Sequence, residues 1–360
     1  MESSYNYYYR TNPDTSYYVF NDIYYQTTPN KWLYLSKKKL DIPEVYYSPV
    51  EKKEVFKLEH VSQVIATEVV DTVTIITPTI SGNFAHAILD HLFPLFCIMN
   101  DYDTKIKYNL FIDKHKIRRF KCAKNIIDFT KKRYTNFIDK LIEPFIEKII
   151  FQIGLGDNKI IHIKKLLVGG VTNYSRSIWT NENFQNYRVR DYTLSNQYFS
   201  KMFQKFSKRY IEYFAIPSSQ PNLIVVCNRW KVQGFTKESS INLLDKIKGL
   251  KLPDLEVYGQ VLYFEDISLE ESIEIMGKTK ILITPHGANI TNSIWMNPES
   301  KILEVFPFPD NRECYFRSLS NILRCNYYHL FQEDNKKRNY DIYWDVNCIQ
   351  ILDMLNSICN

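Results

Sequence analysis

The sequence predicts an α/β fold in two domains, and three observations support this. The chain has 360 residues, more than a single hydrophobic core usually organises. In its second half, short β-branched apolar runs alternate with runs at helical spacing, a pattern typical of a parallel sheet whose strands are joined by helices. Between the halves lies AIPSSQPN, residues 215–222, which has two prolines, two serines and no apolar run. We interpret this stretch as the linker between the domains.

The first domain is predicted to span residues 1–215. Its first 50 residues are rich in Tyr, Asn and Pro and have weak periodicity, so we expect them to be irregular. The elements predicted after them are two short strands within 62–77, a helix over 83–99, a strand at 108–113, mixed helices to about 148, one or two strands within 160–170 and a long amphipathic helix over about 183–214.

The second domain is predicted to span residues 222–335 and to be Rossmann-like. Its expected strands lie at 223–228, 256–264, 280–284 and 301–306, and its expected helices at 237–247, at 268–277 and after the turn at 285–288. Ser268 and Glu271 have the spacing of a capping box, which marks the start of a helix. Residues 336–360 contain a last predicted helix that could pack back on the first domain.

Composition and charge restrict the class of protein. The net charge of +6 comes from 46 basic and 40 acidic residues, and the basic residues form separate clusters rather than the single stripe of a dedicated nucleic-acid binder. We therefore expect no nucleic-acid partner, although an acidic ligand such as a sugar nucleotide would suit the excess. Seven cysteines without a CxxC pair indicate a reducing compartment. The N-terminus does not resemble a signal peptide, and no run reaches the ~20 apolar residues that span a membrane. We expect a cytoplasmic protein with no transmembrane segment.

The turn at residues 285–288, sequence PHGA, is the first candidate site. Ligands of open parallel sheets bind at the carboxyl ends of the strands, where this turn is predicted to lie. The helix after it would offer free N–H groups to an anion, Gly287 would let a phosphate approach the backbone, and His286 could donate a hydrogen bond to a diphosphate. The same residues could also form a purely structural turn. Glu304, in the next strand, could accept hydrogen bonds from a ribose or could be an edge residue.

Two basic residues follow the first strand of the second domain. A nucleoside diphosphate that leaves a sugar gains negative charge, which a metal, a cation or a helix dipole must stabilise. Arg229 is the natural candidate because a guanidinium binds phosphate in bidentate fashion, and Lys231 lies two residues further on. Solvent exposure is the alternative for both. The glycine fingerprint G-x-G-x-x-G and the Walker P-loop are absent from this half, so hydride transfer and ATP hydrolysis lose support.

The predicted helix over 83–99 carries a second constellation. His86 and Asp90 are separated by four residues and so share one helix face. Such a pair can supply a general base, either Asp90 itself or His86 held by Asp90. It can equally be a structural ion pair. The motif DYD, residues 101–103, would suit a divalent metal on sugar-nucleotide phosphates, but it follows a helix rather than a strand, and short acidic matches are common by chance.

Together these stretches resemble the family-61 glycosyltransferases, the group related to plant xylan-decorating enzymes and to animal O-linked N-acetylglucosaminyltransferases. The family pattern G-N-x-x-H-x-x-x-D-x-x-P-x-L is similar to GNFAHAILDHLFPL here, which has one extra residue before the proline. The pattern H-G-A-x-x-T-N, followed by P-x-x-S-x-x-x-E-x-x-P, is similar to HGANITNSIWMNPESKILEVFP. The similarity covers residues 78–99 and 222–308.

The resemblance implies a GT-B architecture, in which two Rossmann-like domains face each other across a cleft. It also implies an inverting glycosyltransferase that moves a sugar from a nucleotide sugar, usually a UDP-sugar, to a hydroxyl of a glycan or protein, without an obligatory metal. Its anchored relatives belong to the secretory pathway. Because this chain has no predicted anchor, it resembles a cytoplasmic enzyme of bacterial or viral type.

The resemblance also assigns roles to residues. On the donor side, Arg229 matches a family arginine, Asn292 would brace the helix start and Glu304 would contact the ribose. Around the diphosphate or nucleoside would lie His286, Gly287, Ala288 and Asn289. On the acceptor side, His86 and Asp90 match the H-x-x-x-D pair, with Asp90 as the base.

One departure from the family pattern raises a rival interpretation. The family usually has a second arginine shortly after the first, where this chain has Gly234 and Phe235. Lys231 or Lys237 could supply the missing charge. Otherwise the chain could be a catalytically degenerate, glycosyltransferase-like binding or structural protein. A nucleotide-sugar epimerase with bound NAD is a further rival, which the absence of G-x-G-x-x-G disfavours.

Overall fold

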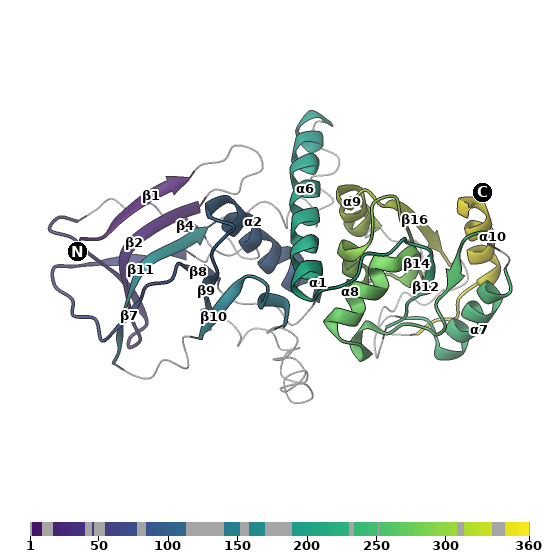
Figure 1. Cartoon of the computed structure of the whole chain (residues 1–360), viewed down its shortest axis with the longest axis horizontal. Coiled ribbons are helices and arrows are strands. Elements are labelled where there is room, and N and C mark those ends of the chain that lie inside the picture. The colour runs from purple at the N-terminus through teal and green to yellow at the C-terminus, as the bar shows by residue number, and fades with distance from the viewer. Residues whose placement is uncertain are drawn as a thin grey trace. The chain divides into compact units, whose positions relative to one another are not determined.

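The computed structural model describes residues 2–8, 17–39, 45–46, 55–77, 84–112, 140–151, 158–169, 189–229, 234–250, 252–307, 313–332 and 343–359. The chain forms two compact units, Met1–Ser177 and Ile178–Asn360 (Figure 1). The predicted linker at 215–222 lies inside the second unit. The division falls before the long helix α6 (Val189–Tyr213) because Phe206 and Tyr210 of α6 pack against Trp295 of the second unit, with ring centroids 6.1 and 4.9 Å away.

The first unit contains a nine-stranded sheet in which the path β10-β9-β8-β11-β2-β3-β6 is extended by β1 beside β2 and by β7 beside β11. Strands β8 to β11 run parallel where they pair, whereas β2 is antiparallel to both β11 and β3. This mixed sheet differs from the all-parallel sheet of a Rossmann-like domain. Its strands are β1 Ser4–Tyr8, β2 Tyr17–Gln26, β3 Lys31–Leu35, β6 Leu58–Val61, β7 Glu68–Val70, β8 Thr74–Thr77, β9 Tyr108–Ile112, β10 Ile146–Phe151 and β11 Ile160–Gly169, and a separate pair is formed by β4 Val45–Tyr46 and β5 Val55–Phe56.

The prediction that residues 1–50 are irregular was wrong. Strands β1, β2 and β3 lie in this segment, and β2 pairs with β11 near the middle of the sheet. Aromatic and β-branched side chains favour strands, and here Phe20, Ile23, Tyr25 and Trp32 are buried in the core of the unit. The many tyrosines and asparagines in this segment made its strands hard to predict from the sequence.

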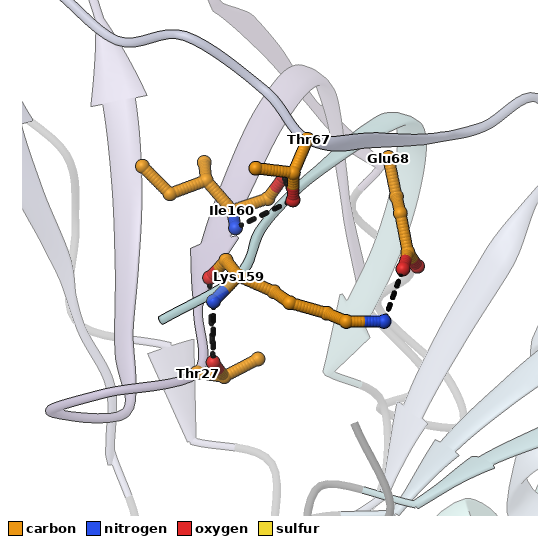
Figure 2. Close-up of polar contacts among 5 residues, drawn as sticks. All are labelled: Thr27, Thr67, Glu68, Lys159 and Ile160. Carbon is orange, nitrogen blue, oxygen red and sulfur yellow. Dashed lines mark hydrogen bonds and ion pairs between the residues drawn. The ribbon is translucent and has the colours of Figure 1, made fainter. Parts of the chain in front are cut away.

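Two threonines hold the start of β11 between β2 and β7 (Figure 2). Thr27, just after β2, accepts a hydrogen bond through its hydroxyl from the backbone N–H of Lys159, at 3.0 Å. On the other side, the hydroxyl of Thr67 accepts one from the backbone N–H of Ile160, also at 3.0 Å. The side chain of Lys159 reaches Glu68 as an ion pair. These contacts fix the register of β11 relative to its neighbours.

The predicted helix over 83–99 has three parts: a short α1 (Phe84–His86), a π-helix η1 (Ala87–Leu92) and α2 (Phe93–Tyr102). In a continuous α-helix, the ring of Pro94 would clash with the backbone carbonyl of residue 90. A wider i→i+5 turn avoids this clash. The end of α2 is tied to β9 because the hydroxyl of Tyr108 donates to the backbone carbonyls of Met99 and Asp103, at 3.1 and 2.7 Å.

The second unit contains a five-stranded sheet in the order β13-β12-β14-β15-β16, and all its pairings are parallel. By position in the chain this order is second, first, third, fourth, fifth, one of the two common doubly wound orders. The strands are β12 Leu223–Val226, β13 Glu256–Val257, β14 Thr279–Pro285, β15 Lys301–Phe306 and β16 Asn326–Phe331. This half therefore has the parallel sheet that the alternating pattern predicts, although the strand expected at 256–264 is only two residues long.

Helices cover both faces of this sheet (Figure 1). On one face lie α7 (Lys237–Lys248) and α10 (Cys348–Cys359), and on the other α8 (Leu269–Lys278) and α9 (Glu313–Leu323). The predicted capping box is confirmed, since Ser268 and Glu271 exchange side-chain-to-backbone hydrogen bonds at the start of α8. The suggestion that the last helix packs on the first domain was wrong, because apolar residues of α10 join the core around β12, β14 and β15. Among the helices that the structure describes, none combines the length and apolar character that spanning a bilayer requires.

Candidate active site

The candidate site lies where the strand order of the second unit reverses. Strand β12 has β13 on one side and β14 on the other, and crevices at such switch points bind ligands outside the carboxyl ends of the strands. Asn228 and Arg229 follow β12 directly, and residues 286–288 follow β14. The structure thus brings together two of the stretches that the sequence singled out, 57 positions apart in the chain.

Asn228 organises the end of β12. Its side-chain oxygen accepts hydrogen bonds from the backbone N–H groups of Arg229 and Phe235, each at 2.9 Å, and its amide donates to the carbonyl of Phe235 at 2.9 Å. The residue is 1% exposed. Asn228 therefore links the backbone of Arg229 to that of Phe235. No motif in the sequence signals this role of Asn228.

The guanidinium of Arg229 occupies a slot, namely the space that a side chain on Gly287 would fill. The guanidinium donates a hydrogen bond from Nη1 to the backbone carbonyl of His286 at 3.2 Å. A Cβ atom on Gly287 would lie 2.4 Å from that Nη1 and 2.7 Å from Cζ. Gly287 also has φ +148° and ψ −173°, a conformation essentially restricted to glycine. Burial lowers the pKa of Arg229, while the charge of Glu265 opposes that shift, and a guanidinium stays protonated at neutral pH in any case.

The imidazole ring of His286 is held by one hydrogen bond and two aromatic rings. Its Nδ1 lies 2.5 Å from Oε1 of Glu304, and its ring stacks on Phe306 and meets Phe316 edge-on, at centroid distances of 4.9 and 5.7 Å. The second carboxylate oxygen of Glu304 accepts a hydrogen bond from the hydroxyl of Tyr327 at 2.5 Å. Burial raises the pKa of Glu304, and the hydrogen bonds from His286 and Tyr327 oppose the shift.

The predicted ribose contact of Glu304 does not follow from this geometry. Glu304 is fully buried in β15, level with Thr284 of β14 and His329 of β16. Both its carboxylate oxygens have protein partners, so a ribose would have to displace one of them. Glu304 therefore lies on the buried side of His286, where it bonds Nδ1.

The helix after the turn is a 3-10 helix, η5 (Ala288–Trp295), instead of the α-helix expected. Its asparagines tie it to its surroundings. Asn289 donates to the backbone carbonyl of Asn228 at 3.1 Å, which joins the ends of β14 and β12. Asn292 donates to the carbonyl of Asn289 at 3.0 Å and accepts from Ser272 of α8 at 2.9 Å. Asn292 therefore braces the first turn of η5, and Ala288 is its half-buried first residue.

The other predicted site residues are less closely defined. Lys231 lies outside the described residues, as do the side chains of His86 and Asp90; the backbone of these two falls at the end of α1 and within η1. In the DYD motif, the carboxylate of Asp103 accepts a hydrogen bond from the backbone N–H of Lys105 at 2.8 Å. Across the described parts of the chain, no group of three His, Cys, Asp or Glu side chains is arranged to hold a metal ion. Burial raises the pKa of Cys227, beside the site, to about 12, so its thiol is not a nucleophile at neutral pH.

Comparison with known protein families identifies the chain. The family profile for Glycosyltransferase 61 matches residues 84–303. The chain belongs to the glycosyltransferase 61 family. The matched region runs from α1 to β15 and so includes both the His86–Asp90 segment and the β12–β14 crevice. This confirms the resemblance found in the two motifs and supports a sugar transferase with a sugar donor and an acceptor. Among curated proteins, none matches the chain.

Proposed function

We propose that this protein is an inverting glycosyltransferase that takes a sugar from a nucleotide sugar, a UDP-sugar first of all, and attaches it to a hydroxyl of a glycan or protein acceptor. The observation that carries the proposal is the guanidinium of Arg229 seated against Gly287 beside His286 at the switch point of the parallel sheet. A cation and a histidine at this edge suit the diphosphate of a nucleotide sugar.

The donor half of the proposal concerns charge. As the bond between the sugar and the diphosphate breaks, negative charge develops on the phosphate oxygens. Arg229 can stabilise that charge from a half-buried position, where electrostatic interactions are stronger than in water. Asn228 and the carbonyl of His286 already fix the arginine, so little reorganisation is needed during the reaction.

The acceptor half rests on the first unit. We assign Asp90 as the general base that takes the proton from the acceptor hydroxyl, with His86 as its partner or as the base itself. The hydroxyl oxygen would then attack the anomeric carbon from the face opposite the leaving diphosphate, which inverts that centre. A GT-B arrangement of the two units would bring this base to the donor. A reaction without a metal cofactor and a cytoplasmic location stay predictions.

A thermal-shift screen tests the donor site. Purified protein is heated with UDP, GDP, CDP, ADP, NAD and UDP-sugars, with and without Mn²⁺. A ligand at ~100 times its dissociation constant adds about 2.7 kcal/mol to the free energy of unfolding. We expect a shift with UDP and UDP-sugars that Arg229→Ala abolishes. The control Lys201→Ala removes the same charge from an exposed position on α6 and should keep the shift. A screen in which none of these nucleotides stabilises the protein would overturn the proposal.

One observation favours a second candidate function, a degenerate scaffold that binds but does not transfer. Near the place where the family has its second arginine, Phe235 is fully buried and packs edge-on against Trp344, with centroids 5.8 Å apart. An apolar core residue there supplies no positive charge. Release of UDP from a UDP-sugar, measured with and without candidate acceptors, separates the two candidates: a protein that binds UDP yet never releases it from the sugar is the scaffold.

A further inference from the structure

Three side chains from neighbouring strands form a buried chain of hydrogen bonds behind the candidate site. Tyr327 of β16 donates to Oε2 of Glu304 on β15, and Oε1 of the same carboxylate lies 2.5 Å from Nδ1 of His286, directly after β14. Glu304 is 0% and His286 7% exposed. Buried polar groups are costly unless they are fully bonded. This series of hydrogen bonds leads from the half-buried Tyr327 on the edge strand β16 to His286 at the end of β14.

This series of hydrogen bonds leaves one ring nitrogen of His286 for a ligand. Nδ1 is engaged by Glu304, and the imidazole ring is held by Phe306, which stacks on it, and by Phe316, which meets it edge-on. Within the described part of the chain, no hydrogen-bond partner is found for Nε2. The backbone carbonyl of His286 also accepts a hydrogen bond from Arg229. His286 therefore both positions the guanidinium and offers Nε2 beside it.

Proton counting shows what Nε2 can do. With one proton between Nδ1 and the carboxylate, the pair has a net charge of −1 and Nε2 is an acceptor, which would repel a diphosphate. With a second proton the pair is neutral and Nε2–H is a donor, whether the histidine is cationic beside a carboxylate or neutral beside a carboxylic acid. Burial, which raises the pKa of Glu304, favours the second proton.

We propose that Tyr327 and Glu304 are positioning residues that hold His286 with its Nε2–H directed at the donor diphosphate, so that binding of the nucleotide sugar takes up one proton. This inference rests on the proposed function. It replaces the ribose contact predicted for Glu304 with a role through His286, and it gives Tyr327, which no motif singled out, a role in donor binding.

Three other charged or titratable groups among the described residues lie near the hydrogen bonds that join Tyr327, Glu304 and His286. Arg229 lies on the β12 side, at the carbonyl of His286. His329 of β16 is level with Glu304, and Arg317 of α9 lies over the ring of Tyr327, with its Nη2 3.5 Å from Nδ1 of His329. The charge of His329 opposes the rise that burial gives the pKa of Glu304, so the second proton is taken up against this group and is favoured by an anionic ligand.

Calorimetric titration over about pH 5.5–9 measures the proton directly. The probes are UDP-glucose, UDP-xylose and UDP-N-acetylglucosamine, whose phosphates are all esterified and keep constant charge over this range. Titrations in two buffers with different ionisation enthalpies give the number of protons taken up. We expect about one proton per ligand on the alkaline side, where affinity falls by up to about tenfold per pH unit. On the acidic side, where the pair already holds both protons, uptake should approach zero.

Two conservative variants separate positioning from a ribose contact. In Glu304→Gln, the side-chain amide can donate to Nδ1 and its oxygen can accept from Tyr327, which fixes Nε2–H at every pH. We expect donor binding to survive with no proton uptake and little pH dependence. A ribose contact would instead weaken binding by the same factor at every pH. In Tyr327→Phe, the carboxylate loses one donor and holds its proton more tightly, so the fall in affinity should move to higher pH.

The outcomes distinguish this inference from the proposed function. If no nucleotide sugar binds at any pH, the proposed function fails and the inference fails with it. If a UDP-sugar binds to the wild type without proton uptake, or if Tyr327→Phe has an unchanged pH profile, the inference alone is overturned. Unfolding curves of both variants at neutral pH identify a variant that has lost its fold, and the wild-type proton uptake then still decides the inference.

Discussion

The two units differ in how deeply they bury their ion pairs. In the second unit, the ion pair at the candidate site joins His286 and Glu304, whose side chains are 9% and 0% exposed. In the first unit, the ion pair beside β11 joins Lys159 and Glu68, at 43% and 46% exposed. The first unit also has a partly buried pair, His162 and Asp22, whose side chains are 11% and 17% exposed. At the candidate site, the carboxylate of Glu304 is fully buried and both its oxygens have protein partners. The comparison indicates that the candidate site is organised before any ligand arrives.

The largest expected effect tests the acceptor half. Asp90→Asn removes the proposed base, so turnover should fall by roughly 100- to 10,000-fold, while UDP still gives its thermal shift. The measurement is release of UDP from the UDP-sugar in the presence of acceptor. Asp71→Asn, on a side chain that is 71% exposed and paired with Lys164, is the matched control and should turn over normally. Wild-type turnover in Asp90→Asn would remove Asp90 from the mechanism.

A smaller but still large effect is expected at the slot for Arg229. Gly287→Ala puts a Cβ 2.4 Å from the guanidinium in a backbone conformation suited to glycine. We expect a loss of about 1–3 kcal/mol in the free energy of unfolding and loss of the nucleotide shift, both measured by thermal and urea unfolding. Gly277→Ala, in α8 with nothing within 4 Å of the added Cβ, should instead gain up to about 1 kcal/mol. Equal effects of the two substitutions would show that the slot is not needed.

The bracing of η5 gives the next prediction. Ser272→Ala removes the donor to the buried side-chain oxygen of Asn292. An unsatisfied buried acceptor costs about 1–3 kcal/mol, which urea unfolding would detect, and nucleotide affinity should fall with it because η5 follows the turn at His286. Ser218→Ala, at an exposed position, should change stability by less than about 0.5 kcal/mol. If both variants unfold alike, the Ser272–Asn292 contact is dispensable.

The smallest effect is expected on the first unit's surface. Glu68→Gln breaks the exposed pair with Lys159 that Figure 2 shows, and exposed pairs contribute about 0–1 kcal/mol. We therefore expect Glu68→Gln to lower the free energy of unfolding by no more than this amount. The loss should vanish in high salt because exposed charges are screened. Thermal unfolding at low and high ionic strength checks this. A loss above about 2 kcal/mol would contradict the contrast between the two units.

Much of the second unit was predictable because its signals are local. The alternating runs place the strands, Ser268 and Glu271 mark the start of α8, and the turn at His286 falls at a strand end. Tyr327 could not be found in this way, since it reaches Glu304 only through the pairing of β15 with β16. No spacing along the chain encodes that pairing.

The first unit was harder to predict for a physical reason. Its strand β2 owes its central place to antiparallel pairing with β11, more than 130 residues away, and non-local pairing leaves no periodic signal within either strand. The sequence of the long helix α6 is compatible with either domain. Its packing in the structure, including that of Phe206 and Tyr210 on Trp295, assigns it to the second unit. The side chains of His86 and Asp90 stay a prediction.

The π-helix η1 explains how the chain accommodates a change in length. Its sequence has one more residue between Asp90 and Pro94 than the family pattern, and the described backbone forms an i→i+5 turn at that place. Such a turn holds one residue more than an α-turn, so the insertion is absorbed where it occurs and the buried face of α2 keeps its rotational phase. The chain can therefore carry an extra residue next to the proposed base without a change in the packing of its core.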